Sequence, residues 1–142
     1  MSDVEKVKQI IENESITLVL VREDDVMTSD KRGIAPLVEL CDGDKSVSGY
    51  CAADKIVGRA AAFLYVLLGV RYVYAEVLSR GGKDVLEGNG IAVEYKTLTD
   101  GIINRKGDGP CPMERAVGNI DDPLSALAAV KAKLAELRSP LS

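Results

Sequence analysis

Histidine is absent from the 142 residues of the chain. Imidazole is the usual base of Ser/His and Cys/His catalytic pairs, and it is the commonest nitrogen ligand of protein-bound zinc. Its absence excludes both catalytic pairs and every zinc site that contains histidine. Any general base must therefore be an aspartate, a glutamate, a lysine, a tyrosine or a cysteine thiolate.

Cysteine, long apolar segments and a secretion signal are scarce or missing. Cys41, Cys51 and Cys111 are an odd number without paired spacing, so we expect free thiols. The longest apolar stretch, 56–70, is interrupted by Gly58 and Arg59 and is shorter than the roughly 20 residues that span a bilayer. The first fifteen residues lack the basic leader and apolar core of a signal peptide. We expect a cytoplasmic protein with no membrane partner.

The residues that are present have the composition of a compact globular domain. The chain is 46% hydrophobic and 28% charged, with a net charge of −4. A chain of this length can bury about two thirds of its unfolded surface around one core, so we expect a single domain over residues 1–142. The acidic balance disfavours nonspecific binding of nucleic acid.

Hydrophobic periodicity predicts alternating helices and strands. Strands are expected at 16–21, 26–29, 45–52, 70–78 and 91–99, and helices at 2–11, 34–41, 54–70, from 79 and from 123. Asp122 would cap the last helix, whose apolar face comprises Leu124, Leu127, Val130, Leu134 and Leu137. This order predicts a three-layer α/β/α domain with a mixed, largely parallel sheet and a buried central helix.

In such folds ligands bind beyond the carboxyl ends of the strands, where the central helix is expected to begin. Asp54 would be its N-cap, with Lys55 at the first position and Arg59 one turn later on the same face. Like charges at this end oppose the macrodipole by roughly a few tenths of a kcal/mol each. Either an anion supplies the counter-charge or both side chains reach solvent. Gly58 would cost about 1 kcal/mol within a helix, and close backbone approach is its expected reason.

A second segment, Ser79 to Asp84, places glycines at a helix start. Gly81 and Gly82 would expose backbone N–H groups, and Arg80 adds positive charge, which suits an oxyanion or a phosphate. The spacing is not that of a phosphate-binding loop, and a plain turn is the alternative.

The third segment is GPCPMERAV, residues 109–117. Pro110 and Pro112 fix the backbone around Cys111, and Glu114 falls in a first helical turn. A thiol at a helix N-terminus can have its pKa lowered and act as a nucleophile. A buried structural cysteine followed by an ordinary N-terminal glutamate is the alternative.

The order of elements over residues 49–95 resembles the cytidine-deaminase-like fold. More narrowly, ADKIVGRAAA followed by CPMERAV resembles an uncharacterised prokaryotic family of unknown function with that fold. Deaminases carry His- or Cys-Ala-Glu at the central helix and Pro-Cys-x-x-Cys at the next one. Here Cys51 is followed by an acid one residue late, at Asp54, and the 79–84 segment has no thiol. Cys111 comes one strand later than the zinc-binding cysteines of deaminases. The resemblance therefore implies the fold and the location of the pocket, but not the zinc ion that activates water in deaminases.

These observations lead to three functional hypotheses. The first is a metal-independent and cofactor-independent site for a small anionic, nucleotide-like ligand, held by Lys55, Arg59 and the turn of Ser79, Arg80, Gly81 and Gly82. Asp54 would orient Lys55 or accept a proton, and in a catalytic version Cys111 would be the nucleophile beside Glu114. The second is a catalytically inert regulatory or partner-binding module. The third is a zinc deaminase that uses Cys51 and Cys111. Homo-oligomerisation is suggested only by fold-level analogy.

Overall fold

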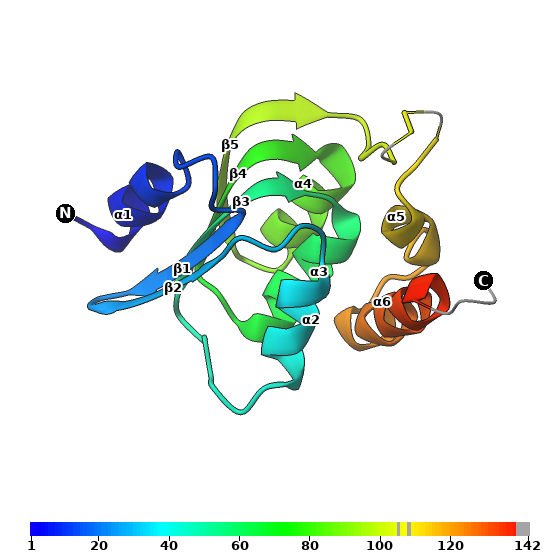
Figure 1. Cartoon of the computed structure of the whole chain (residues 1–142), viewed down its shortest axis with the longest axis horizontal. Helices are drawn as coiled ribbons and strands as arrows, with labels where there is room; N and C mark the ends of the chain where they lie inside the picture. Colours follow the sequence, from blue (N-terminus) through cyan, green and yellow to red (C-terminus); the bar gives the residue numbers. More distant parts are fainter. Residues whose placement is uncertain (105, 108, 139–142) are drawn as a thin grey trace.

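The computed structural model describes residues 1–104, 106–107 and 109–138, and a five-stranded sheet lies at its centre (Figure 1). The strand order is β2-β1-β3-β4-β5. Strand β1 is antiparallel to both neighbours, whereas β3, β4 and β5 are mutually parallel. The expected mixed sheet is therefore present. The bounds are Leu18–Arg22 (β1), Asp25–Ser29 (β2), Cys51–Val57 (β3), Tyr72–Ser79 (β4) and Ala92–Thr99 (β5).

Helices cover both faces of the sheet, which gives the expected layered α/β architecture. Helix α1 lies on one face, while α2, α3 and α4 lie on the other, with α5 and α6 packed outside α3 (Figure 1). Within the described residues, no helix is long and apolar enough to cross a membrane. The bounds are Asp3–Ile10 (α1), Ala35–Asp42 (α2), Arg59–Leu68 (α3), Arg80–Gly88 (α4), Pro112–Ala116 (α5) and Pro123–Arg138 (α6).

Helix α3 is the buried central helix that the sequence predicts. All six residues from Ala60 to Tyr65 are buried, and α2, α4 and α6 pack around them. The larger hydrophobic core surrounds this helix. A smaller core lies on the opposite face of the sheet, beneath α1, and comprises Val7, Ile11, Val19, Val21, Cys51, Ala53 and Tyr72.

The start of the central helix differs from the prediction. Asp54 and Lys55 belong to strand β3, and α3 begins only at Arg59, with Gly58 as its N-cap. Strand β3 pairs with β1 on one side and with β4 on the other. Two ladders of hydrogen bonds and the β-branched Ile56 and Val57 outweigh the local helical pattern. The prediction that Asp54 caps this helix was therefore wrong.

The closing helix α6 begins where the sequence predicts but buries a narrower face. Asp122 accepts a hydrogen bond from the backbone N–H of Ser125 at 2.9 Å, so it is the N-cap. Val130 is buried as expected, together with Ala126. Leu124 and Leu137, which the sequence places on the apolar face, are 70% and 54% exposed.

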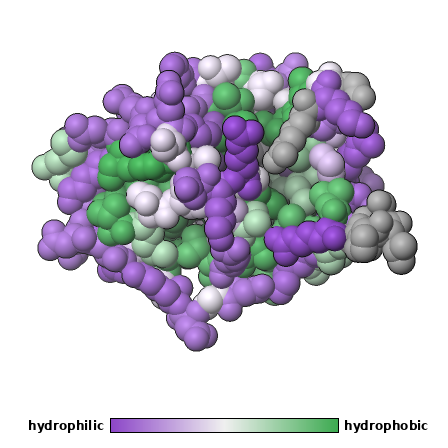
Figure 2. Space-filling view, viewed as in Figure 1, coloured by the Kyte–Doolittle hydropathy of each residue, from purple (hydrophilic) through white to green (hydrophobic). Residues whose placement is uncertain are grey.

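A groove of about 550 Å³ lies between the β1–β2 hairpin and α2. Figure 2 shows hydrophobic residues over the hairpin, between hydrophilic ones. Leu18, Leu20, Met27, Pro36 and Leu40 supply the apolar lining, and Lys31 and Glu39 form an ion pair of 3.6 Å at the rim. The groove is separate from the segments that the sequence singles out.

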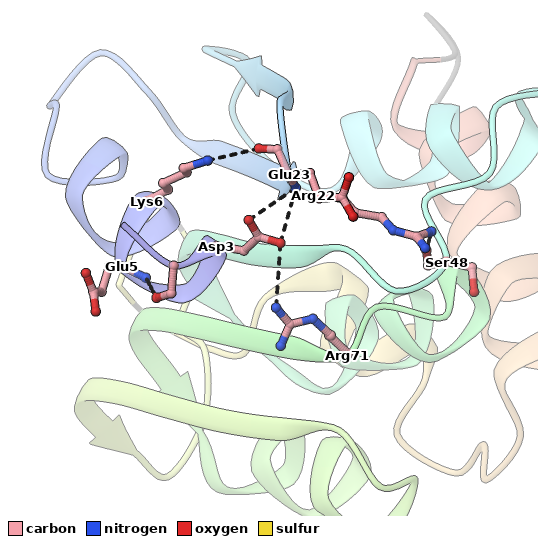
Figure 3. Close-up of polar contacts among 8 residues, drawn as sticks. Asp3, Glu5, Lys6, Arg22, Glu23, Ser48 and Arg71 are labelled. Atoms are coloured by element: carbon pink, nitrogen blue, oxygen red, sulfur yellow. Dashed lines mark hydrogen bonds and ion pairs between the residues drawn. The ribbon is translucent and has the colours of Figure 1, made fainter.

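One carboxylate of α1 contacts both the β1–β2 hairpin and Arg71, the residue before β4 (Figure 3). Asp3 accepts hydrogen bonds from the backbone N–H of Glu23 at 3.1 and 3.2 Å and pairs with Arg71 at 3.6 Å. Glu23 has a φ of 56°, in the left-handed region that residues other than glycine seldom adopt. Lys6 donates to the carbonyl of Glu23 at 3.0 Å, so α1 satisfies both backbone groups of this turn.

Candidate functional site

The first turns of α3 and α4 meet at the carboxyl ends of β3 and β4. Ser79 is buried and is the N-cap of α4, where its hydroxyl accepts a hydrogen bond from Gly82 N at 2.9 Å. A Cβ at Gly82 would lie 3.0 Å from the carbonyl carbon and oxygen of Gly58. The start of α4 approaches the backbone at Gly58 this closely because Gly82 has no side chain. The helix start that the sequence predicts at Ser79 is confirmed.

The N-terminus of α3 is capped by a carboxylate from a distant part of the chain. Gly58 has no side chain with which to accept the first N–H groups of the helix. Glu114, from α5, accepts hydrogen bonds from Arg59 N at 2.6 Å and from Ala60 N at 2.9 Å. A Cβ at Gly58 would lie 2.6 Å from the Glu114 carboxyl carbon and 2.8 Å from Ile102 Cγ1. Gly58 therefore leaves the space that the carboxylate fills.

The Arg59 side chain contacts the C-terminal end of α5. Its guanidinium donates to the carbonyl oxygen of Val117 at 2.5 Å and pairs with Asp121 at 3.2 Å. It also lies 4.9 Å from the centre of the Phe63 ring. Val117 is the C-cap of α5, where the helix dipole favours a cation. Arg59 and Glu114 thus hold the two ends of α5 against the start of α3.

Arg80, Gly81 and Gly82 lie at this junction as the sequence predicts, but their side-chain environments differ. A Cβ at Gly81 would be in ordinary contact with the Arg59 alkyl chain, at 3.5 Å from its Cδ. Arg80 extends into solvent and pairs with Asp100 at 2.9 Å, with exposed side-chain fractions of 65% and 96%. An ion pair this exposed contributes little stability, so Arg80 is free to exchange partners.

Cys111 occupies the N-cap position of α5, as the sequence expects for the mouth of a helix. Its backbone N–H donates to the Ile102 carbonyl at 2.9 Å, and its partly buried side chain packs against the larger core. The adjacent Glu114 carboxylate is directed toward α3. Cys51 lies in the smaller core on the opposite face of the sheet, so these two cysteines cannot share a metal ion as the third hypothesis requires.

Lys55 lies apart from Arg59. Its ammonium group donates to the Ile11 carbonyl at 2.5 Å, at the end of α1, and lies 3.5 Å from Glu76. A lysine at the C-terminal end of a helix is favoured by the dipole, which is a structural explanation for this residue. The predicted pairing of Lys55 with Arg59 was wrong, since β3 directs Lys55 toward α1.

Asp54 points the other way, beneath α3. Its carboxylate accepts a hydrogen bond from the Tyr65 hydroxyl at 2.7 Å and a longer one from Ile56 N at 3.3 Å. Burial raises the pKa of Asp54 to about 6, although the hydrogen bonds oppose this shift. Burial, together with the nearby carboxylate, raises the pKa of Tyr65 well above its usual value. Asp54 is therefore a partly buried acid that does not orient Lys55.

The residues at the junction are Gly58, Arg59, Ser79, Arg80, Gly81, Gly82 and Glu114, with Cys111 on the adjoining turn. Within the described ranges, no group of three or more cysteine, aspartate or glutamate side chains is arranged to hold a metal ion. What the junction can do chemically is bind a negatively charged oxygen group. Two N–H groups at the positive end of α3 already do so with the Glu114 carboxylate.

Comparison with solved structures identifies a close match in fold. The crystal structure of a DUF1893 family protein (TM1506) from Thermotoga maritima matches with a TM-score of 0.82 and 23% identity, over 96% of this chain and 91% of that chain. Two structures of the dCMP deaminase from cyanophage S-TIM5, the apo form and the complex with dCMP and dUMP, have TM-scores of 0.43 and 0.44. Their identities are 18% and 13%, over 65% of this chain and 90% and 92% of those chains.

A search of curated proteins gives no match. The family model described as TM1506, domain of unknown function (DUF1893), matches residues 6–134. This match covers nearly all of the chain, including the GRAAA and CPMERAV segments on which the resemblance rests. The chain belongs to the DUF1893 family.

Proposed function

We propose that this protein binds a small anionic ligand at the N-terminus of α3, in the position that the Glu114 carboxylate fills. The observation that carries the proposal is the pair of hydrogen bonds from Arg59 N and Ala60 N to that carboxylate, at 2.6 and 2.9 Å. A carboxylate and one edge of a phosphate present similar oxygen atoms to two adjacent N–H groups. Glu114 is therefore an internal substitute for the ligand's oxyanion.

The surroundings of this position support an anion. The N-terminus of α4 reaches the same junction, so the positive ends of two helix dipoles converge there. Gly81 and Gly82 keep the α4 start free of side-chain bulk. Arg80 is an exposed cation on the same turn, and its partner Asp100 is itself exposed. A nucleotide-like ligand could place its phosphate at α3 and a second charged group near Arg80.

Glu114 makes the binding competitive. A tethered carboxylate has an effective local concentration on the order of millimolar or more, so an external anion must displace it. Displacement would remove one of the two contacts that hold α5 against α3 and would leave the hydrogen bond from Arg59 to the Val117 carbonyl. Ligand binding is thus coupled to the position of residues 112–116. If Glu114 never leaves, the α3 position binds no external anion, and the second hypothesis, a catalytically inert regulatory or partner-binding module, is the alternative.

The nucleophilic role of Cys111 is a subsidiary part of the proposal. Displacing Glu114 would open the space next to the α5 N-cap, where the Cys111 thiol is partly buried. Lys55 and Asp54 are not part of this proposal, because Lys55 contacts the end of α1 and Asp54 binds the Tyr65 hydroxyl. The proposed site accordingly comprises Gly58, Arg59, Ala60, Ser79, Arg80, Gly81 and Gly82.

Chemical rescue tests the proposal. Glu114→Ala removes the internal carboxylate and should leave a vacant anion position at α3. Acetate or inorganic phosphate, titrated against chloride at equal ionic strength, should then raise the melting temperature of this variant in a saturable manner. Wild-type protein should respond much less, because Glu114 competes.

Asp122→Ala is the matched control. It also removes an N-cap carboxylate, but Asp122 is an exposed residue at the start of α6. Acetate should not rescue this variant. If Glu114→Ala and Asp122→Ala respond equally to both anions, the α3 position is not an anion site and the proposal fails.

A further inference from the structure

Strand β5 forms a long open edge of the sheet. It pairs with β4 on one side and ends the strand order on the other (Figure 1). It is eight residues long, and five of its side chains are exposed, namely those of Ala92, Glu94, Tyr95, Lys96 and Thr97. An open edge offers unpaired backbone N–H and C=O groups to another strand, and proteins usually shorten, bend or cover such edges. Within the described residues, β5 has no strand on its outer side.

The charges on this edge are arranged symmetrically about one residue. Glu94 and Lys96 flank Tyr95, so both project from one face of the strand while Tyr95 projects from the other. Glu94 accepts a hydrogen bond from the Tyr72 hydroxyl at 2.8 Å and lies 3.5 Å from Lys8. Lys96 is exposed, and no described residue forms an ion pair with it.

We propose that β5 pairs in antiparallel register with β5 of a second copy of the chain, with the two-fold axis at Tyr95. Glu94 would then face the partner's Lys96, and Lys96 would face the partner's Glu94. The same register sets Val93 opposite the partner's Thr97. The two Tyr95 side chains meet at the axis, where aromatic cross-strand pairs are favourable. The interface is isologous, as in most two-fold dimers.

The charges select this register over its neighbours. A shift by two residues in one direction would centre the pair on Glu94 and oppose two glutamates. The equivalent shift the other way would centre it on Lys96 and oppose two lysines. Like charges directly opposite each other are destabilising. A shift by one residue would put opposite faces of the two sheets on the same side of the dimer.

The other open edge, β2, lacks this complementarity. It is five residues long, against eight for β5, and Asp25 is its charged residue. Self-pairing of β2 centred on Met27 would set Asp25 opposite the partner's Ser29, with no ion pair. We therefore place the interface with the second copy at β5, the longer edge with complementary charges.

Light scattering after size-exclusion chromatography, over a wide range of protein concentration, tests the proposal. The wild-type chain should be a dimer that dissociates on dilution. Glu94→Lys places lysines opposite each other across the axis, and Lys96→Glu places glutamates opposite each other. Each variant alone should therefore raise the dimer Kd by about tenfold or more. Equimolar mixing restores both Glu–Lys pairs in a heterodimer, which should form with near wild-type affinity.

Glu12→Lys, an exposed change on another surface, is the control for net charge and should leave the Kd unchanged. Lys96→Glu removes no described contact within the protomer, so its monomer should keep the wild-type circular dichroism spectrum and melting behaviour. A monomeric wild-type chain, or a dimer that neither charge variant weakens, would overturn the proposal. Loss of dimerisation by both variants without recovery on mixing would overturn the register. None of these outcomes depends on anion binding at α3.

Discussion

The Glu114 carboxylate occupies the space that a side chain at Gly58 would need. The two residues are far apart in the chain, yet a Cβ at Gly58 would lie 2.6 Å from the Glu114 carboxyl carbon. The glycine and the glutamate therefore form one unit: the first removes the local cap of α3, and the second replaces it from α5. This unit connects the GRAAA and CPMERAV segments physically.

Gly58→Ala tests this relationship through the sign of its effect on stability. At most helical positions a change from glycine to alanine stabilises a protein by about 0.5 to 1 kcal/mol. Here the new methyl group must expel Glu114 and press on Ile102, so we expect a loss of about 2 to 4 kcal/mol, from the lost cap and the overpacking together. Urea denaturation measures the difference.

Gly88→Ala provides the matched control in α4. A Cβ at Gly88 meets no atom within 4 Å, and its backbone φ is not in the left-handed region. This variant should be slightly more stable than wild type, by about 0.5 to 1 kcal/mol. Equal effects of the two substitutions would contradict the close packing of Glu114 on Gly58.

Arg59 and Glu114 should be energetically coupled, because they hold opposite ends of α5. Glu114→Ala removes two hydrogen bonds to backbone N–H groups and should cost about 1 to 3 kcal/mol. Arg59→Ala releases the Val117 carbonyl and the stacking on Phe63, with a similar cost. Once either tether is lost, α5 is already loosened, so the double variant should be less destabilised than the sum. A double-mutant cycle measured by urea denaturation gives the coupling, and strict additivity would mean that α5 is not held as one unit.

Much of the fold could be predicted from local patterns. The capping box at Ser2, the return strand at 26–29, the buried central helix and the Ser79 helix start all follow from short-range periodicity and capping chemistry. The start of the central helix could not, because Asp54 followed by Lys55 and an apolar run fits a capped helix N-terminus locally. Pairing with β1 and β4 decided between them, and it is not visible in a local window.

Only part of the candidate site could be predicted, because the rest depends on the same pairing of β3. Arg59 and the Ser79–Gly82 turn precede or begin helices at adjacent strand ends, so the topology brings them together. Lys55 was misassigned because it was predicted to lie in the central helix. It belongs to strand β3, which directs its side chain to the other face of the sheet. The capping role of Glu114 had one overlooked signal: Gly58 cannot satisfy the first N–H groups of a buried helix, so an acceptor must come from elsewhere.

Asp54 should give the protein a characteristic dependence of stability on pH. Its folded-state pKa of about 6 lies above its value of about 3.9 in an unfolded chain. The folded state therefore binds this proton more tightly, and the contribution is complete below about pH 4 and lost as the pH rises through 6. The linkage amounts to at most about 2 to 3 kcal/mol. The difference in unfolding free energy between wild type and Asp54→Asn, measured across this range, isolates the contribution from other carboxylates.

Tyr65→Phe sharpens this test. The Tyr65 hydroxyl stabilises the charged form of Asp54, so its removal should raise the pKa of Asp54 further. The loss of stability between pH 4 and pH 7 should then be larger than in wild type. A wild-type profile identical to that of Asp54→Asn would show that this carboxylate titrates normally, contrary to its burial.

Thiol labelling should separate the three cysteines and test the proposed role of Cys111. Burial raises the pKa of Cys41 to about 11, so only about 0.1% of this thiol is ionised at pH 8. Cys51 is fully buried, and burial raises its pKa as well. Cys111 should therefore react first with a disulfide reagent, as mass spectrometry of the labelled protein and of Cys111→Ser would establish. In Glu114→Ala the displaced α5 should make Cys111 react faster still, while Cys51 remains protected. Equal rates in both backgrounds would mean that Glu114 does not govern access to this thiol, and the nucleophile hypothesis should then be abandoned.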